Sequence, residues 1–155
     1  MNKWYSKYLQ VYEKPFSEAS PSIVEEVRQN IAKLQSNNPI VTVSLIGYNE
    51  EKHLLACLWS LSEMQCKYPV EIIGVDNESK DRTAEIFQAC GVPYHTETQH
   101  SCGFARLCGL NNARGKYHIN IVSEMFENRT GIFRCIFKRN HLKLYIWTIL
   151  LKLWP

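Results

Sequence analysis

Short runs of apolar, β-branched residues alternate along this chain with stretches whose apolar positions recur every three or four residues. The runs predict four β-strands, at residues 40–46, 70–75, 92–94 and 117–122. The stretches between them predict three helices, at residues 54–61, 84–89 and 104–113. Because parallel strands need crossover connections, strands that alternate with helices predict an α/β fold with a mostly parallel sheet flanked by helices.

A polar leader at residues 1–38 precedes this alternation and contains one further helix signal. Ser20 can cap a helix, Pro21 suits the first helical position, and Glu25 follows Ser22 by three residues, as in a capping box. The apolar positions that follow have helical spacing, namely Ile23, Val27, Ile31 and Leu34. We therefore expect an amphipathic helix that packs against the body of the protein.

The charge of the chain is divided unevenly between its body and its tail. The 155 residues are 45% hydrophobic and 21% charged, which excludes a disordered, collagen-like or coiled-coil protein and fits one domain. Residues 126–155 carry six basic groups and one acidic group, a net charge of +5. The rest of the chain has a net charge of −2, within a total of +3, so the positive charge belongs to the tail.

The cysteines and the apolar segments indicate a cytoplasmic protein. The six cysteines form no Cys-x-x-Cys pair and have no histidines at zinc-ligand spacing, so we expect buried, reduced thiols. The first ten residues lack the apolar run of a secretory signal. No window reaches the roughly 20 apolar residues that span a bilayer.

Two polar loops follow the first two predicted strands, at the edge where an open parallel sheet binds its ligands. The first contains Tyr48 and Asn49, and the second begins with Asp76 and Asn77. An aromatic ring beside amide and carboxylate groups suits the base and ribose of a nucleotide. There is no glycine-rich phosphate loop, and the acidic Glu50 disfavours a phosphate at the next helix, so a metal or an arginine would have to bind the phosphates.

A purely structural role is the alternative for these loops. Asn49 with two acids after it, and also Ser79 and Asp81, are good helix N-caps. Each of these residues, considered alone, is more typical of a helix cap than of a binding site. Their position at the ends of adjacent strands favours a functional site.

Three stretches together resemble the family 2 glycosyltransferases, which have the GT-A fold. They are residues 40–51 (IVTVSLIGYNEE), 71–83 (EIIGVDNESKDRT) and 103–117 (GFARLCGLNNARGKY). The resemblance implies a Rossmann-like, nucleotide-binding half with an incomplete C-terminal part. It divides the chain into a helical leader, a nucleotide-sugar-binding core, and a basic, aromatic tail unlike the family, at residues 1–38, 39–121 and 122–155.

The resemblance implies transfer of a hexosyl group from a nucleotide-sugar donor to an acceptor hydroxyl, on a glycan or a lipid-linked molecule. The residues that would line the donor site are, by position, Tyr48, Asn49, Glu50, Asp76, Asn77 and Arg106. Asp76 would contact the base, and Arg106 would face the diphosphate, whose oxygens suit a planar guanidinium. Without the resemblance, Arg106 would be interpreted as a solvated charge on a helix.

The sequence departs from the family at the site of its divalent metal, Mg²⁺ or Mn²⁺. Family members end the fourth strand in an Asp-x-Asp pair, which holds the metal on the donor diphosphate. This chain has Val122, Ser123 and Glu124 there, so we assign no metal ligand and no catalytic residue. We interpret the chain as a truncated, impaired transferase whose residues from about 122 onward are an aberrant ending.

Two alternatives come from other functional classes. One is a non-catalytic, nucleotide-binding remnant. The other is a module peripheral to the inner face of a membrane, because Phe133, Tyr145 and Trp147 are interleaved with basic residues in the tail. Nucleic acid is not an expected partner, since no recognised binding module accompanies the charge.

Overall fold

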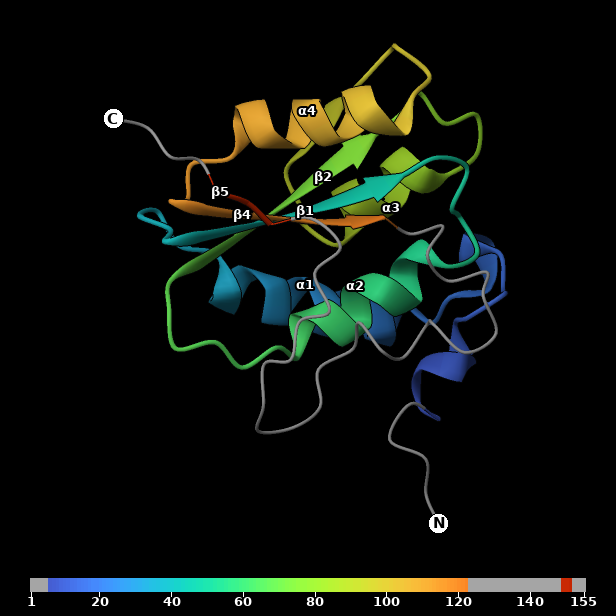
Figure 1. Ribbon diagram of the computed structural model, residues 1–155. Helices are drawn as coiled ribbons and strands as arrows, with labels where there is room; N and C mark the ends of the chain where they lie inside the picture. The colour runs from blue at the N-terminus through green and yellow to red at the C-terminus, as the bar shows by residue number, and fades with distance from the viewer. Residues whose placement is uncertain (1–5, 123–148, 152–155) are drawn as a thin grey trace.

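The computed structural model describes residues 6–122 and 149–151. Within these residues, one sheet has the strand order β3–β2–β1–β4–β5 (Figure 1). Its strands are β1 (Val41–Gly47), β2 (Val70–Asp76), β3 (Tyr94–Thr96), β4 (Tyr117–Val122) and β5 (Ile149–Leu151). Strands β1 to β4 are parallel to one another, and β5 pairs with β4 in antiparallel orientation. The predicted α/β class with a mostly parallel sheet is confirmed.

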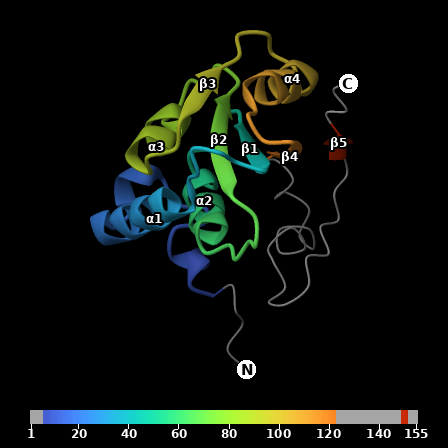
Figure 2. The same ribbon diagram turned by 90° about the vertical axis from the view of Figure 1, so that its left-hand side faces the viewer.

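Helices cover both faces of the sheet (Figures 1 and 2). They are α1 (Pro21–Leu34), α2 (Leu54–Ser62), α3 (Thr83–Ala89) and α4 (Cys102–Asn112), with short 3₁₀ helices η1 (Tyr8–Gln10) and η2 (Phe16–Glu18) in the leader. α1, α2 and α3 pack on one face, and α4 lies on the other. The pleat of β1 divides the core accordingly, since Val43 and Leu45 join the first cluster, whereas Ile46 meets Ala105 of α4.

Helix α2 lies between the sheet and the leader, which explains why it is mostly apolar. All nine of its residues are buried. Tyr8 packs edge-on against Trp59, with ring centroids 5.5 Å apart, and Val27 and Ile31 of α1 have no exposed surface. The predicted packing of the leader helix against the body of the protein is confirmed, and this apolar burial is a main source of stability.

The start of α1 differs from the predicted capping box. Pro21 occupies the first helical position, as predicted. The hydroxyl of Ser20, however, is hydrogen bonded to that of Ser22 at 2.8 Å and makes no cap to the helix backbone, while Glu25 accepts from Gln29 at 2.9 Å. The capping-box prediction was wrong, because the N-cap is Ser20 and Ser22 lies within the helix, so Glu25 is not at the third helical position.

The third strand begins two residues later than the predicted strand at 92–94. Pro93 has no N–H to donate to a ladder, but its carbonyl accepts from the N–H of Gly74 at 2.7 Å, and the strand continues from there. A glycine is required at position 74, where β2 meets the third strand, since a Cβ on Gly74 would lie 2.8 Å from the ring of Phe87. That ring stacks on Tyr94, with centroids 5.8 Å apart.

The described cysteines are free thiols, as predicted, but they are not all buried. Cys57 and Cys90 are buried, and burial raises the pKa of the Cys90 thiol to about 12. Cys102, at the start of α4, is exposed. The expectation of uniformly buried thiols was therefore wrong.

Most of the tail lies outside the described residues. Of residues 122–155, the structure describes Val122 and the three residues of β5. The interpretations of the tail as an aberrant ending or a membrane-binding segment therefore stay predictions. Within residues 6–122 and 149–151, no helix is long and apolar enough to cross a bilayer.

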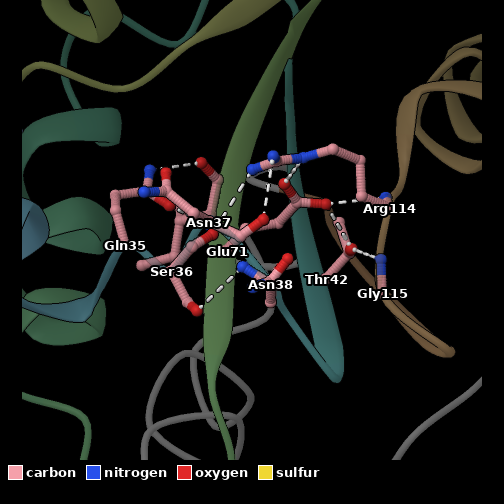
Figure 3. A network of polar contacts seen from close by, with 9 residues as sticks. Gln35, Ser36, Asn37, Asn38, Thr42, Glu71, Arg114 and Gly115 are labelled. Atoms are coloured by element: carbon pink, nitrogen blue, oxygen red, sulfur yellow. Dashed lines mark hydrogen bonds and ion pairs between the residues drawn. The ribbon is translucent and has the colours of Figure 1, made fainter.

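A buried carboxylate joins β1 and β2 at their amino ends to the segment before β4 (Figure 3). Oε1 of Glu71 accepts from the Thr42 hydroxyl (2.6 Å) and from the Arg114 backbone N–H (2.7 Å), and Oε2 accepts from Nε of Arg114 (2.7 Å). Thr42 Oγ1 accepts in turn from the N–H of Gly115 (2.8 Å). Burial opposes ionisation of Glu71, but these donors outweigh it and hold the pKa of the carboxyl below its ordinary value.

Candidate functional site

The loops after β1 and β2 leave the sheet side by side. Gly47 and Asp76 are register partners at the carboxyl ends of these strands, and the N–H of Asn77 donates to the Gly47 carbonyl at 2.9 Å. The strand order runs outward from β1 to β3 and then returns to the other side of β1, so the topological switch point lies between β1 and β4, beside the loop after β1. The fold thus brings together the two polar loops predicted to form a site.

Asn49 joins the first loop to the second instead of capping α2. Its backbone N–H donates to the Ser79 hydroxyl (2.9 Å), and its side-chain oxygen accepts from the N–H of Lys80 (2.8 Å). Its φ of 53° lies in the left-handed region, which asparagine tolerates better than most residues. Since α2 begins only at Leu54 and the Ser79 hydroxyl contacts Asn49, the capping predictions for Asn49 and Ser79 were wrong.

Asp81 holds both the start of α3 and the first loop. Its Oδ1 accepts from the N–H (2.9 Å) and the hydroxyl (2.5 Å) of Thr83, the first residue of α3, although the N-cap position itself is Arg82. Its Oδ2 accepts from the N–H of Glu51 at 2.9 Å. The Thr83 hydroxyl oxygen also accepts from the N–H of Glu50 at 2.8 Å. One carboxylate therefore fixes the backbone of both loops.

Asp76 and Asn77 are both buried, but their side chains have different surroundings. The Asn77 amide nitrogen donates to the carbonyls of Glu97 (2.8 Å) and Gln99 (2.9 Å), which anchors the loop after β3. Oδ1 of Asp76 accepts from the N–H of Ser79 at 3.2 Å. Among the described residues, no donor reaches its other oxygen, Oδ2, which leaves an acceptor for a ligand.

Glu50 and Tyr48 differ in exposure and in what they contact. Glu50 is 8% exposed, and its Oε2 lies 2.9 Å from Nδ1 of His53, whose ring centroid lies 5.1 Å from that of Tyr12 in the leader. Tyr48 is 40% exposed, and its ring centroid lies 5.8 Å from that of His100. Glu50 therefore has a structural partner, whereas Tyr48 presents an aromatic surface.

Arg106 lies on α4, apart from the five loop residues. The helix begins at the carboxyl edge of the sheet, where the Ser101 hydroxyl accepts from the N–H of Gly103 at 3.2 Å. Arg106 is exposed next to the buried Ala105, and no described residue forms an ion pair or hydrogen bond with its side chain. The structure thus leaves its guanidinium available for phosphate oxygens.

Sequence reasoning missed two residues of this site. Thr83 bonds to both loops through its hydroxyl, and His100 contacts Tyr48 from the loop before α4. Thr83 is an ordinary first residue of a helix, and His100 lies in a loop with no apolar pattern. Neither belongs to a sequence pattern that indicates a site, because the partners that connect them to the first loop, Glu50 and Tyr48, are distant in the sequence.

The described residues do not fit the divalent metal that the family resemblance implies. In the part of the chain that the structure describes, no group of three or more His, Cys, Asp or Glu side chains could hold a metal ion. The position of the expected Asp-x-Asp pair falls at residues 122–124, of which only Val122 is described. No chemical step is therefore assigned to a metal.

Known proteins resemble this chain in sequence and in fold. A family model described as glycosyl transferase family 2 matches residues 42–121, just over half of the chain. A similar solved structure is glucosyl-3-phosphoglycerate synthase from Mycobacterium tuberculosis in complex with UDP. It is 22% identical with a TM-score of 0.50, over 65% of this chain and 38% of that one. This chain therefore spans less than two fifths of the length of that synthase.

Two further solved structures are less similar in fold. The same synthase with Mn²⁺, UDP-glucose and phosphoglyceric acid is 22% identical with a TM-score of 0.49, over 64% of this chain and 37% of that one. Mannosyl-3-phosphoglycerate synthase from Rubrobacter xylanophilus is 19% identical with a TM-score of 0.40, over 77% of this chain and 39% of that one. No curated protein sequence matches the chain significantly. The UDP complex supports the predicted Rossmann-like GT-A architecture.

Proposed function

Because this chain belongs to glycosyl transferase family 2, we propose that it binds the nucleotide of an activated sugar, as a truncated transferase whose transfer of the sugar to an acceptor hydroxyl is impaired. The observation that carries the proposal is the Asp76 carboxylate at the carboxyl end of β2, next to the end of β1. It is 4% exposed, and no described residue donates to its Oδ2. An oxygen to which no described residue donates can accept from the N–H of a base or from a ribose hydroxyl.

Tyr48 and Arg106 extend the proposed site from the base to the phosphates. The exposed Tyr48 ring offers a stacking surface, and the Arg106 guanidinium suits the oxygens of a diphosphate. Asn49, Glu50 and Asn77 are proposed to shape the pocket, because their hydrogen bonds hold the loops in place. Uridine diphosphate is the first nucleotide to test, because the similar synthase was solved with it.

A second candidate function is nucleotide binding without sugar transfer. It is favoured by the residues at positions 122–124, where one glutamate replaces the family's pair of aspartates. The leader at 1–38 and the core at 39–121 are proposed to form the binding unit, with the tail at 122–155 outside the family pattern. We propose that the acceptor is a glycan, a lipid-linked molecule or a small phosphorylated acid. Direct assay with each class of acceptor distinguishes between them.

Calorimetric titration of the full chain with UDP tests donor binding. We expect wild-type protein to bind and Asp76→Ala to weaken binding about tenfold, since one hydrogen bond to a charged group is lost. Glu25→Ala removes an exposed carboxylate from α1 and should leave the affinity unchanged. The proposal fails if the wild-type chain binds none of UDP, GDP and ADP.

The same preparations separate the two candidate functions when nucleotide sugars and Mg²⁺ or Mn²⁺ are added. We expect no release of nucleoside diphosphate above the level of Asp76→Ala, because the metal-binding pair is missing from the sequence. Release well above that level would instead establish a working transferase.

A further inference from the structure

The side chain of His100 contacts both loops of the candidate site. Its Nε2 lies 2.9 Å from Oε2 of Glu78, in the loop after β2. Its ring lies against that of Tyr48, in the loop after β1, with centroids 5.8 Å apart and planes at 66°. His100 itself belongs to the loop between β3 and α4. Three segments that are distant in the sequence therefore meet at this imidazole.

The backbone that carries His100 is held in place by the buried Asn77. The Asn77 amide nitrogen donates to the carbonyls of Glu97 (2.8 Å) and Gln99 (2.9 Å). The N–H of Gln99 donates to the Glu97 carboxylate (2.9 Å), and the N–H of Ser101 donates to the Gln99 carbonyl (2.7 Å). Since these bonds lie on both sides of His100, the fold determines where its backbone is placed.

Stability does not explain these surface contacts. The side chains of His100 and Glu78 are 54% and 51% exposed, and exposed ion pairs contribute little to the free energy of unfolding. Tyr48 keeps 40% of its surface exposed in spite of the imidazole beside it. The ring is thus accessible to a ligand while a neighbour restricts how it can turn.

We infer that His100 is a positioning residue, which holds the Tyr48 ring in the orientation that stacks on the nucleobase of the donor. The inference rests on the proposed function and deepens it. An unrestrained tyrosine would lose rotamer freedom when a base stacks on it, and that loss weakens binding. A ring already held by an imidazole loses less, so His100 raises the affinity without touching the base.

A double-mutant cycle with UDP as the ligand tests this inference. Tyr48→Leu is expected to lower the affinity about tenfold, because a base–aromatic stack is lost. His100→Ala is expected to lower it about fourfold, because the Tyr48 ring becomes free to turn. In the Tyr48→Leu background, His100→Ala should have no further effect, since there is no ring to position.

Glu78→Ala is a second variant for the same cycle, and it serves if His100→Ala does not fold. It releases the imidazole without changing either ring, so a smaller loss is expected, again absent in the Tyr48→Leu background. Equal losses in both backgrounds would show a general disturbance of the loop and overturn the inference. An unchanged affinity of His100→Ala would overturn it while leaving donor binding intact. A wild-type chain that binds no UDP removes the proposed function and this inference with it.

Discussion

Glu71→Gln is expected to lower the free energy of unfolding by about 3 kcal/mol, the lower end of the cost of breaking a buried ion pair. The side chain of Glu71 is 3% exposed and accepts from three donors. A glutamine has only one accepting oxygen, so its amide nitrogen would face an N–H of Arg114. The loss stays near this lower end because the Arg114 side chain is 59% exposed, and water replaces part of its contact.

Urea unfolding at several pH values checks this prediction, with Glu85→Gln as the matched control. Glu85 also pairs with an arginine, Arg82, but both side chains are exposed, so no measurable change is expected. The pKa of Glu71 lies below its ordinary value of 4.5, so its contribution is complete above that pH and is lost as the pH falls through the folded-state pKa. The difference between wild type and Glu71→Gln should therefore be constant near neutral pH and shrink below about pH 4.5. A difference below about 0.5 kcal/mol at pH 7 would contradict the structural role.

Asp81→Ala is expected to lower the free energy of unfolding by about 2 kcal/mol and the UDP affinity more than tenfold. The Asp81 carboxylate accepts from the N–H and hydroxyl of Thr83 and from the N–H of Glu51. Without it, the bonds that fix both loops of the proposed site are lost together. Chemical denaturation and calorimetric titration with UDP measure the two effects.

Asp81→Asn is the control variant for this prediction. It keeps the size of the side chain and one accepting oxygen, so it should retain the contacts to Thr83 or the one to Glu51. Losses between those of wild type and Asp81→Ala are expected. If Asp81→Ala binds UDP as tightly as the wild type, the loops are not ordered by this carboxylate in the way the structure indicates.

Two buried acids on β2 show how structural and functional carboxylates can be told apart. Glu71 and Asp76 are 2% and 4% exposed, at opposite ends of the same strand. Glu71 is satisfied at both oxygens by Thr42 and Arg114, which explains its conformation fully. Among the described residues, the Asp76 carboxylate accepts one bond, from the N–H of Ser79, at only one of its oxygens. This carboxylate lies at the edge where parallel sheets bind ligands, which is why the functional proposal rests on it.

Most elements of the fold could be predicted from the sequence, because each one repeats its apolar residues with the period of its structure. The strand at 117–122 was predicted with its observed bounds, and the one at 40–46 was displaced by a single residue. The third strand was less accurate, since its position depends on a bond between Pro93 and Gly74 that lies outside any local pattern. Apolar periodicity reports burial, and it does not report which backbone groups pair.

The candidate site was predictable in its location but not in its connections. Tyr48 and Asp76 follow directly from two polar loops at the ends of adjacent strands. The capping role expected for Asn49 was displaced by bonds to Ser79 and Lys80, about thirty residues further along the chain. His100 carried no signal, because its relation to Tyr48 exists only after folding. Local capping patterns cannot reveal a polar side chain that bonds to a distant loop.

Amide chemical shifts measured during titration of the full, ¹⁵N-labelled chain with UDP test the central claim most directly. We expect saturable shifts at the backbone amides of residues 47–51 and 76–80, at the carboxyl ends of β1 and β2. The amides of Arg114 and Gly115, at the opposite end of the sheet, should not move. Shifts confined to that opposite end or to the tail, or no saturable shift at either loop, would contradict the claim that these loops form a nucleotide site.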